Sequence, residues 1–434
     1  MRIIVAVHHF PPRYTSGAEL RAYRTAARLR DYGHDVRVIC VESVDVGARG
    51  LEFEDKVYDG LPVRRFSFDL AAASDPFRWA YDNPWIREHL HGYLSDWTPD
   101  VFHLISGYLM SGSALWAAQG LGIPTVLTLT DFWFLCPRIT LLRSDGRLCA
   151  PPFDAITCAR CLGEEKRRYR VPGQLAPRLM QVYWRSQSGS VARVQARMDY
   201  LRETLNAVNV IISPSQFLRD MFIQAGAPPR RIRFSRQGRD FPGLAPEKTA
   251  VPPSGLRIGY LGQIAPHKGV RVLFEAVRRI DSAPLTVQAW GDGSRFPAYA
   301  RRLRRLARSD SRLKLAGTYE RSEVSRVFRE LDLVVVPSVW YENSPNVILE
   351  AFAHRTPVVA SRLGGMAELV TDGVNGFQFE PGNADDLASV LYRFVEQPGL
   401  AAELGRGVPP VRTVQEEIEE LLQVYANVEV GRDV

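Results

Sequence analysis

Residues that could bind a phosphorylated sugar lie close together in the second half of this 434-residue chain. Glu342 and Glu350 stand eight residues apart, and Pro345 between them suits the first turn of a helix, where the N–H that proline lacks has no partner. The N–H groups of Asn346 and Val347 would then face a ligand with the positive end of the helix dipole behind them, which favours a phosphate. Glu342 could accept hydrogen bonds from sugar hydroxyls, and Glu350 from a ribose diol.

The alternative is that Glu342 is a solvated loop acid and Glu350 a surface acid of the helix. Glu350, however, lies in the otherwise apolar run 347–353. A carboxylate in such surroundings needs a partner. The sequence therefore favours a binding role for both carboxylates.

Alternating strand and helix patterns surround this stretch in both halves of the chain. In the first half, a buried strand at 3–7, a loop with a glycine, a helix at 18–30 and a strand at 36–41 form a βαβ unit, whose parallel strands need a crossover helix. Further apolar, β-branched runs predict strands at 101–105, 125–130 and 208–212. The second half predicts a helix at 270–279 and strands at 256–261, 285–290, 333–337 and 358–361.

This pattern predicts an α/β protein with two doubly wound, Rossmann-like domains. We expect ligands at the carboxyl ends of the strands, in an interdomain cleft. The N-terminal domain is placed at 1–240 and the C-terminal domain at 255–410, and the Pro-rich stretch 242–254 is interpreted as the linker between them. The final segment, 411–434, contains an amphipathic helix at 414–428.

The composition is that of an ordinary globular chain with a basic surplus. Hydrophobic residues make up 46% and charged residues 24%, which excludes disordered, collagen-like and disulfide-scaffold proteins. The formal net charge of +7 belongs to the first half: residues 1–240 hold 32 Lys and Arg against 24 Asp and Glu, and residues 241–434 hold 23 against 24. A basic surplus suits nucleic acid, an anionic membrane or a phosphorylated ligand. No run of 18 apolar residues and no signal-peptide pattern is present, so we expect a cytoplasmic protein.

The sequence around the two carboxylates resembles a known family. Pro-Ser-Val-Trp-Tyr-Glu-Asn-Ser-Pro at 337–345, the second Glu with its following Ala, Pro-Val-Val-Ala at 357–360 and Gly-Gly-Met-Ala-Glu at 364–368 resemble the donor half of the retaining glycosyltransferases of family 4, which have the GT-B fold. The likeness runs from Arg2 to about Tyr425. The resemblance implies that the donor sugar, phosphate and ribose are held by Glu342, Asn346, Val347 and Glu350.

A second matching segment is Leu-Gly-Gln-Ile-Ala-Pro-His-Lys-Gly at 261–269, which resembles the family's loop between a strand and a helix. The resemblance implies that Gly262, Gln263 and Lys268 line the donor and that Lys268 neutralises its diphosphate, because a cation stabilises the charge on the leaving group. Most relatives have Arg where Gln263 stands. We therefore expect either that another Arg binds the diphosphate or that the diphosphate is bound more weakly. The alternative for Lys268 is a surface residue at a helix start.

Two further binding residues are implied by the resemblance. Gly17 matches the family's N-terminal glycine loop, where a small residue lets the backbone approach the diphosphate and acceptor. Tyr319, in Gly-Thr-Tyr at 317–319, and Gly-Asp-Gly at 291–293 resemble segments that line the base pocket. A simple turn role for 291–293 is the alternative.

A departure from the family lies in Leu-Thr-Leu-Thr-Asp-Phe-Trp-Phe-Leu-Cys-Pro at 127–137. A subgroup with this segment has His where Thr130 stands, and Thr cannot hold a proton near pH 7. We expect Asp131 and His103 to share that catalytic work, unless the donor differs or activity is reduced. The alternative for His103 is a histidine at the edge of the core.

The resemblance implies a reaction. A sugar moves from a nucleoside diphosphate sugar of the UDP or GDP type, with retention, to a hydroxyl of a glycan or lipid-linked acceptor, in cell-surface polysaccharide or glycoconjugate synthesis. The leaving phosphate accepts the proton, so no protein nucleophile and no cofactor is required. The resemblance implies that the N-terminal domain binds the acceptor and the C-terminal domain the donor. The C-terminal helix is expected to cross back to the N-terminal domain. The alternatives are a GT-B nucleotide-sugar epimerase and a non-catalytic GT-B scaffold.

Four of the five cysteines crowd into one region, which we interpret as an insertion in the N-terminal domain. Their spacing could close a tetrahedral, structural zinc site, and the last two have the C-x-x-C spacing of a metal knuckle. The alternative is four reduced thiols or redox-labile pairs. The residues concerned are Cys136, Cys149, Cys158 and Cys161.

A basic, aromatic-bearing stretch follows the cysteines. Residues 163–203 contain nine Lys and Arg against four Asp and Glu. The stretch could lie on an anionic lipid surface, which would put the protein on the inner face of the membrane. It could also cradle an acidic acceptor or be a solvated helical face. Nucleic acid is not expected, because no binding motif for it is present.

Overall fold

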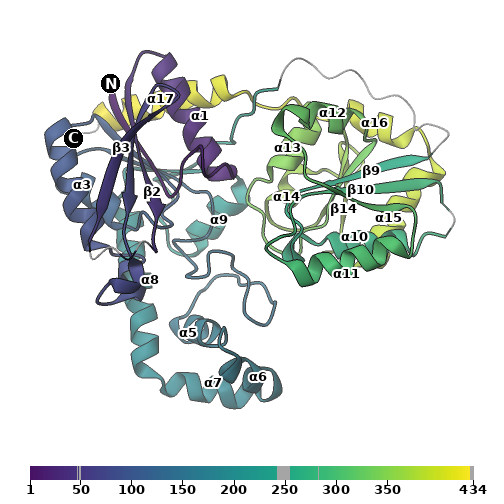
Figure 1. The fold of residues 1–434 in the computed structure, drawn as a ribbon, viewed down its shortest axis with the longest axis horizontal. Helices are drawn as coiled ribbons and strands as arrows, with labels where there is room; N and C mark the ends of the chain where they lie inside the picture. The colour runs from purple at the N-terminus through teal and green to yellow at the C-terminus, as the bar shows by residue number, and fades with distance from the viewer. Residues whose placement is uncertain (46, 48–49, 242–254, 282, 431–434) are drawn as a thin grey trace. The chain divides into compact units, whose positions relative to one another are not determined.

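The computed structural model describes residues 1–45, 47, 50–241, 255–281 and 283–430, and the expected linker at 242–254 lies outside them. The chain forms two compact units. Unit 1 comprises Met1–Arg236 and Val414–Val434, and unit 2 comprises Gln237–Thr413. Each unit has its own sheet with helices on its faces (Figure 1). Two parallel-sheet α/β domains confirm the predicted fold class.

Unit 1 is built on an eight-stranded sheet with the order β3-β4-β2-β1-β5-β6-β7-β8. All neighbouring strands are parallel except β3 and β4, which form an antiparallel hairpin at one edge. The strand order reverses between β1 and β5, so the loops after these two strands meet at the carboxyl edge of the sheet. The strands are β1 (Arg2–Val7), β2 (Asp35–Ser43), β3 (Glu52–Tyr58), β4 (Leu61–Ser67), β5 (Val101–Ile105), β6 (Thr125–Thr128), β7 (Val210–Ser213) and β8 (Ile232–Phe234).

The helices of unit 1 bury an apolar face against this sheet. Ala22, Ala26 and Leu29 of α1 recur at helical spacing and pack into the core over β1 and β2. The last helix, α17, joins the same core through Ile418 and Tyr425, and it lies beside α1 in Figure 1. The helices outside the insertion described below are α1 (Gly17–Asp31), α2 (Pro76–Trp79), α3 (Pro84–Trp97), α4 (Ser113–Gly120), α9 (Gln216–Gln224) and α17 (Val414–Val430).

A helical arm interrupts unit 1 between β6 and β7. It consists of α5 (Ala155–Gly163), α6 (Arg167–Leu175), α7 (Pro177–Ser186) and α8 (Ser188–Ala207), and it extends below the sheet in Figure 1. Pro177 at the first turn of α7 forces the break between α6 and α7. The arm has a small apolar cluster of its own, separate from the core of the sheet.

Unit 2 is built on a six-stranded parallel sheet with the order β11-β10-β9-β12-β13-β14, which reverses between β9 and β12. Its strands are β9 (Leu256–Leu261), β10 (Leu285–Trp290), β11 (Leu313–Gly317), β12 (Leu333–Val336), β13 (Val358–Ser361) and β14 (Gly376–Phe379). Its helices are α10 (Val270–Val277), α11 (Pro297–Arg308), α12 (Val324–Arg329), α13 (Asn346–Ala353), α14 (Gly364–Leu369), α15 (Ala384–Glu396) and α16 (Leu400–Arg406). The β-branched residues of β9, β12 and β13 are buried on both faces, as expected for central parallel strands.

Candidate functional site

The loops after β9 and β12 meet where the strand order of unit 2 reverses. Gly269 allows this approach: its φ is +73°, and a Cβ there would overlap the carbonyl oxygen of Pro337 in the other loop. The N–H of Val339 donates to the carbonyl of His267, 2.9 Å away, which ties the two loops together. Side chains 74 residues apart in the sequence are thereby brought to one edge of the sheet.

Lys268 and Glu342 form the centre of this arrangement. Lys268 Nζ lies 2.6 Å from Glu342 Oε1, and both side chains are largely buried. The same oxygen accepts hydrogen bonds from Ser338 Oγ and Trp340 Nε1, each at 2.8 Å. Lys268 also lies 4.9 Å from the centre of the Trp340 ring, a cation–π distance. The carboxylate and the ammonium are therefore both fixed in position.

The local electrostatics keep this carboxylate ionised. Burial raises the pKa of Glu342, but Lys268 and the hydrogen bonds from Trp340 and Ser338 outweigh it, so the pKa lies below its ordinary value. Burial and the neighbouring Lys268 lower the pKa of His267 to about 4. The site therefore presents one anion and one cation near neutral pH. A lysine ammonium has three donors and the contact with Glu342 uses one, so Lys268 can also bind an anionic ligand.

Helix α13 starts next to these residues, as the sequence predicts. Pro345 is its N-cap, and helix geometry leaves the N–H groups of Asn346 and Val347 without intrahelical partners. Gln237 Nε2 donates to Asn346 Oδ1 at 2.7 Å, which fixes that side chain. Glu350 Oε1 lies 3.9 Å from an Arg239 nitrogen. The partner expected for this carboxylate is thus an arginine that the sequence does not single out.

The other residues that the sequence predicts to bind the donor lie on the same unit. Gly262 follows β9 directly, and its N–H donates to the carbonyl of Trp290 at 3.0 Å. Gln263 is half-buried, and its carbonyl accepts from Tyr260 Oη at 2.7 Å. Tyr319 packs against the apolar cluster that includes α13. Their contact with a ligand stays a prediction.

In unit 1, the loop after β1 contains an arrangement that the sequence did not predict. Gly17 begins α1 and is exposed, and Ser16 Oγ donates to Glu19 Oε2 at 2.6 Å. His8 Nε2 lies 3.3 Å from Glu19 Oε1. Burial raises the pKa of Glu19, but His8 and Ser16 outweigh it and bring the value to about 2. A backbone turn and an ionised carboxylate therefore lie at the carboxyl edge of this sheet too.

Asp131 follows β6 and stabilises a turn. Its Oδ1 accepts from the N–H of Trp133 at 2.8 Å, and its Oδ2 accepts from Ser106 Oγ at 3.0 Å and from Thr130 Oγ1 at 3.2 Å. The side chain is only half-buried. A catalytic part for Asp131 stays a prediction, and the structure gives it a definite structural one.

Comparison with known proteins fits this geometry. A family model described as "Glycosyl transferase 4-like domain" matches residues 16–237, about half of the chain, and one described as "Glycosyl transferases group 1" matches residues 255–397. The chain belongs to the family 4 glycosyltransferases of the GT-B fold. The resemblance found in the sequence is thereby confirmed.

The glycosyltransferase has relatives of several kinds. It is 24% identical over 429 residues to the glycogen synthase of Mycobacterium tuberculosis strain H37Rv, covering 94% of this chain and 89% of that protein. It is 31% identical over 146 residues to the uncharacterized glycosyltransferase MJ1178 of Methanocaldococcus jannaschii, covering 34% of this chain and 40% of that protein, which is less than half of that relative. The solved structure of Anabaena HepE with UDP has a TM-score of 0.68 at 18% identity, covering 98% of this chain and 100% of that one, and it shares the fold.

His103 lies inside unit 1 of the glycosyltransferase. The side chain is buried, with Nε2 2.7 Å from Thr128 Oγ1 and Nδ1 2.6 Å from Tyr425 Oη of α17. Burial lowers the pKa of His103 to about 3, so it is neutral near pH 7. Because both ring nitrogens are engaged within the protein, this position favours the structural alternative over a catalytic role.

The four clustered cysteines of the glycosyltransferase are free thiols near one another. Burial and the neighbouring Cys136, Cys149 and Cys161 raise the pKa of Cys158 to about 12. Arg143 Nε lies 3.1 Å from Cys149 Sγ. Four thiols suit zinc chemically. However, in the part of the chain that the structure describes, no three His, Cys, Asp or Glu side chains are grouped so that they could hold a metal ion. Zinc stays a prediction.

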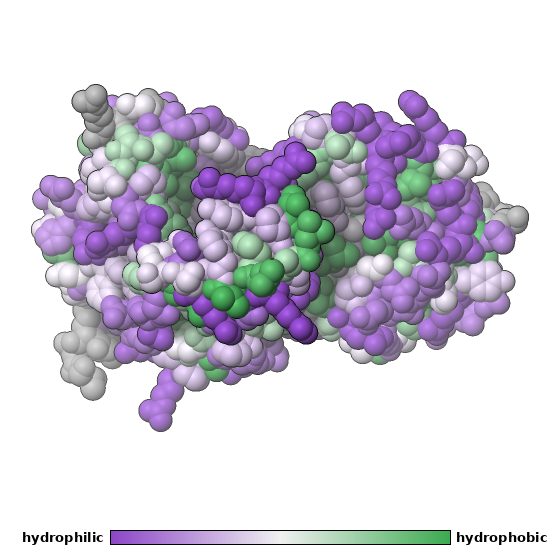
Figure 2. Space-filling model, turned by 90° about the horizontal axis from the view of Figure 1, so that it is seen from below, coloured by the Kyte–Doolittle hydropathy of each residue, from purple (hydrophilic) through white to green (hydrophobic). Residues whose placement is uncertain are grey.

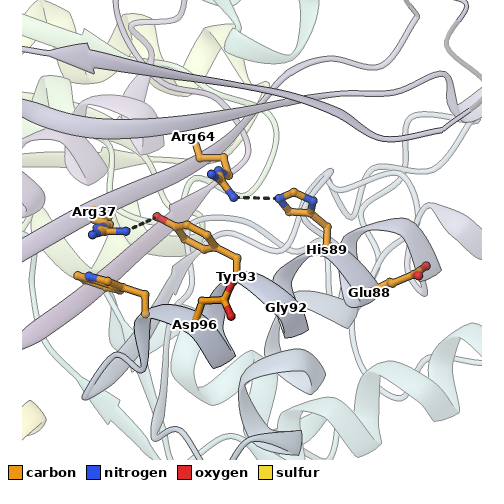
Figure 3. Close-up of a pocket in the computed structure, with 8 residues that line it drawn as sticks. Arg37, Arg64, Glu88, His89, Gly92, Tyr93 and Asp96 are labelled. Carbon is orange, nitrogen blue, oxygen red and sulfur yellow. Dashed lines mark hydrogen bonds between the residues drawn. The ribbon is translucent and has the colours of Figure 1, made fainter.

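A separate surface pocket of unit 1 lies between the sheet and α3 (Figure 3). Its arginines are already engaged. Arg64 forms a two-pronged ion pair with Asp55, at 2.5 and 2.7 Å, and Arg37 donates to Tyr93 Oη at 3.2 Å and stacks on Trp97. The Arg37 contacts hold α3 to the sheet, and the Arg64 ion pair joins β4 to β3, so the pocket is assigned no ligand.

Some site residues were missed by sequence reasoning. Ser338 and Trp340 lie inside the motif around Glu342, but their contacts with that carboxylate depend on how the loop folds. His8 and Glu19 are separated by a loop and a helix turn. The signal that could have found them is their position directly after β1 and in the first turn of α1. No helix among the described residues is long and apolar enough to cross a membrane.

Proposed function

We propose that this glycosyltransferase is a retaining hexosyltransferase that uses a nucleoside diphosphate sugar of the UDP or GDP type. Its acceptor would be a hydroxyl of a glycan or lipid-linked molecule, in the synthesis of a cell-surface polysaccharide or glycoconjugate. The observation that carries the proposal is the contact between Lys268 and Glu342 beside the start of α13. A similar structure, Anabaena HepE, was solved with UDP-glucose, which supports a donor of this class.

The proposed chemistry needs no protein nucleophile. The bond between C1 of the sugar and the donor phosphate oxygen breaks, and the acceptor oxygen bonds to C1 on the same face. The acceptor's proton goes to the departing phosphate oxygen. Lys268 and the N–H groups of Asn346 and Val347 would stabilise the negative charge that develops on the diphosphate. Glu342, ionised and fixed, would orient the sugar through a hydroxyl.

The two alternatives make different demands on the site. A nucleotide-sugar epimerase would bind the same donor but return an isomeric nucleotide sugar. A non-catalytic scaffold would not need the Lys268–Glu342 ion pair. Gln263 stands where most relatives have Arg, and this departure is the observation that favours a scaffold. The family models matched over both units favour sugar transfer.

Donor turnover by the full chain tests the proposal. UDP-glucose, UDP-N-acetylglucosamine and GDP-mannose are first screened for thermal stabilisation, since a ligand at a hundred times its Kd stabilises a protein by about 2.7 kcal/mol. Stabilising donors are then incubated with glycan and lipid-linked acceptors, and nuclear magnetic resonance gives the anomeric configuration of the product. Glu342→Gln should abolish transfer while the matched control Glu396→Gln, an exposed acid of unit 2, keeps it. An inverted product would contradict retention, and an isomerised donor without transfer would identify an epimerase.

A further inference from the structure

The helical arm of unit 1 carries a charge pattern that the sugar-transfer site does not use. Residues 166–186 contain six basic residues and no acidic one. All six side chains are exposed, and their positive charge is not balanced within the segment. The basic residues are Lys166, Arg167, Arg168, Arg170, Arg178 and Arg185.

The inner face of α7 packs against the rest of the arm. Trp184 of α7 is buried in the arm's own apolar cluster with Ala159 of α5 and Val194 of α8, and Met180 packs against it. A Cβ at Gly163 would overlap the Trp184 ring, so α5 and α7 are in close contact there. The orientation of α7 is therefore set, and with it the face that α7 turns outward.

The outer face of the arm is apolar and uncovered. Leu175 is 81% exposed, and Leu179 and Val182 of α7, spaced three residues apart on one side of the helix, are 72% and 64% exposed. Of the eleven exposed large hydrophobic residues in the described chain, five lie between Val171 and Tyr183. Figure 2 shows this face as a hydrophobic band on the arm with hydrophilic side chains on either side.

We propose that α6 and α7 dock this glycosyltransferase onto a membrane surface that contains anionic lipids. Leu175, Leu179 and Val182 would enter the boundary between headgroups and acyl chains, and the six basic residues would bind the lipid phosphates. An amphipathic helix with an apolar stripe and a basic border is the usual form of an interfacial anchor. Each basic residue near an anionic surface strengthens binding about five-fold. A protein that bound this face would need a surface with an apolar centre and acidic side chains around it, in the same arrangement as the apolar and basic residues of this segment.

The inference goes beyond the proposed sugar transfer and can fail independently of it. Vesicle binding is measured without donor or acceptor, and the substituted residues lie in a different unit from Lys268 and Glu342. Docking of the arm would bring the protein to the lipid surface where a lipid-linked acceptor is found.

Co-sedimentation of the full chain with vesicles tests the proposal. We expect binding to vesicles of phosphatidylcholine mixed with phosphatidylglycerol, and at least about ten-fold weaker binding to phosphatidylcholine alone. Leu179→Asp combined with Val182→Asp should weaken binding by about ten-fold or more, and so should Arg178→Glu combined with Arg185→Glu. Thermal unfolding should be unchanged in both variants, because these side chains are exposed.

Matched controls test whether vesicle binding depends on the arm in particular or on any exposed apolar or basic residue of the protein. Val57→Asp changes an equally exposed apolar residue on β3, 73% exposed. Arg301→Glu combined with Arg304→Glu reverses two exposed charges on α11, a helix that has no exposed large hydrophobic residue. Equal loss of binding in these controls, or no binding to anionic vesicles, would overturn the proposal. So would concentration-dependent dimerisation that the Leu179→Asp and Val182→Asp pair abolishes while vesicle binding persists, because the stripe would then bind a second copy.

Discussion

At the scale of single residues, Lys268 is the group whose removal is most informative. It is the cation of the only Lys–Glu pair that the described residues bring to the carboxyl edge of the unit 2 sheet. Removing one preorganised donor to a developing negative charge lowers turnover by about 100- to 1000-fold in other enzymes. We expect Lys268→Ala to lower kcat/KM for the donor by about 100-fold, measured as nucleotide release during transfer.

The control for this prediction keeps the charge. Lys268→Arg should retain more activity than Lys268→Ala, because the guanidinium still supplies a positive charge, although its planar donors fit differently. Lys314→Ala, which removes an exposed lysine of β11, should leave turnover unchanged. Equal activity of Lys268→Ala and the unmodified protein would contradict the assignment of Lys268 to the diphosphate.

The sequence predicted the two members of this pair but not their surroundings. Glu342 and Lys268 could be found because each lies in a short motif directly after a strand. The hydrogen bonds from Ser338 and Trp340, and the proximity of Arg239 to Glu350, depend on side-chain directions and on contacts between distant segments. For His103 the sequence suggested chemistry, but it could not indicate the contact with Tyr425, which is 322 residues away.

At the scale of elements, His103 links β5 to α17 and makes their packing sensitive to pH. Its pKa is about 3 in the folded chain, lowered by burial, against an ordinary value near 6.5. Between these values the unfolded chain binds a proton that the folded chain does not, so stability falls as pH falls below about 6.5. We expect this residue to cost about 2 kcal/mol of unfolding free energy between about pH 7 and about pH 5.

The measurement is urea unfolding at the two pH values for the unmodified protein and for His103→Gln. The variant should be less stable near pH 7, because the bonds to Thr128 and Tyr425 are perturbed, but it should lose about 2 kcal/mol less on acidification. His91→Gln, which changes an exposed histidine of α3, serves as control. An identical pH dependence in His103→Gln and the unmodified protein would contradict the buried, neutral histidine.

The cysteine cluster formed by the loop after β6 and by α5 gives a second prediction at this scale. We propose that Cys136, Cys149, Cys158 and Cys161 bind a structural zinc ion after their side chains rearrange. The thiols already influence one another's pKa values, and Arg197, buried beside them, would offset part of the negative charge of four thiolates. Elemental analysis of protein purified without chelator should find about one zinc per chain. Metal-free protein with four titratable thiols in this cluster would contradict the proposal.

Regular elements were predictable where their sequence pattern was strong. The strands at 101–105, 256–261, 285–290 and 358–361 begin and end at the predicted residues, because each is a buried, largely β-branched or apolar run. The hairpin of β3 and β4 was missed. Its edge strand β3 is mostly exposed and charged, so it has no apolar run, and it is stabilised by pairing with β4. The separate helices of the arm were not delimited from the sequence, since α6 and α7 are short and each contains a proline.

At the scale of the whole molecule, the basic surplus and the donor chemistry belong to different units. The six basic residues of 166–186 account for most of the surplus in the first half of the chain, and the second half is close to neutral. A nearly neutral unit can still bind a diphosphate, because the N–H groups at the start of α13 and one lysine supply the positive potential. Strong general attraction of polyanions to unit 2 is therefore not expected.

This division predicts where a donor protects the chain from hydrogen exchange. With UDP-glucose or GDP-mannose added to the full protein, whichever stabilises it, backbone exchange should slow in the loops 262–269 and 337–345 and in the first turn of α13. Exchange in the arm helices α6 and α7 should not change, because no donor contact is expected there. Lys268→Ala should reduce the protection at the same donor concentration, since it removes the cation for the diphosphate. Protection confined to unit 1 would mean that the donor binds beside Gly17 and Glu19, and the assignment of the two sheet edges would have to be exchanged.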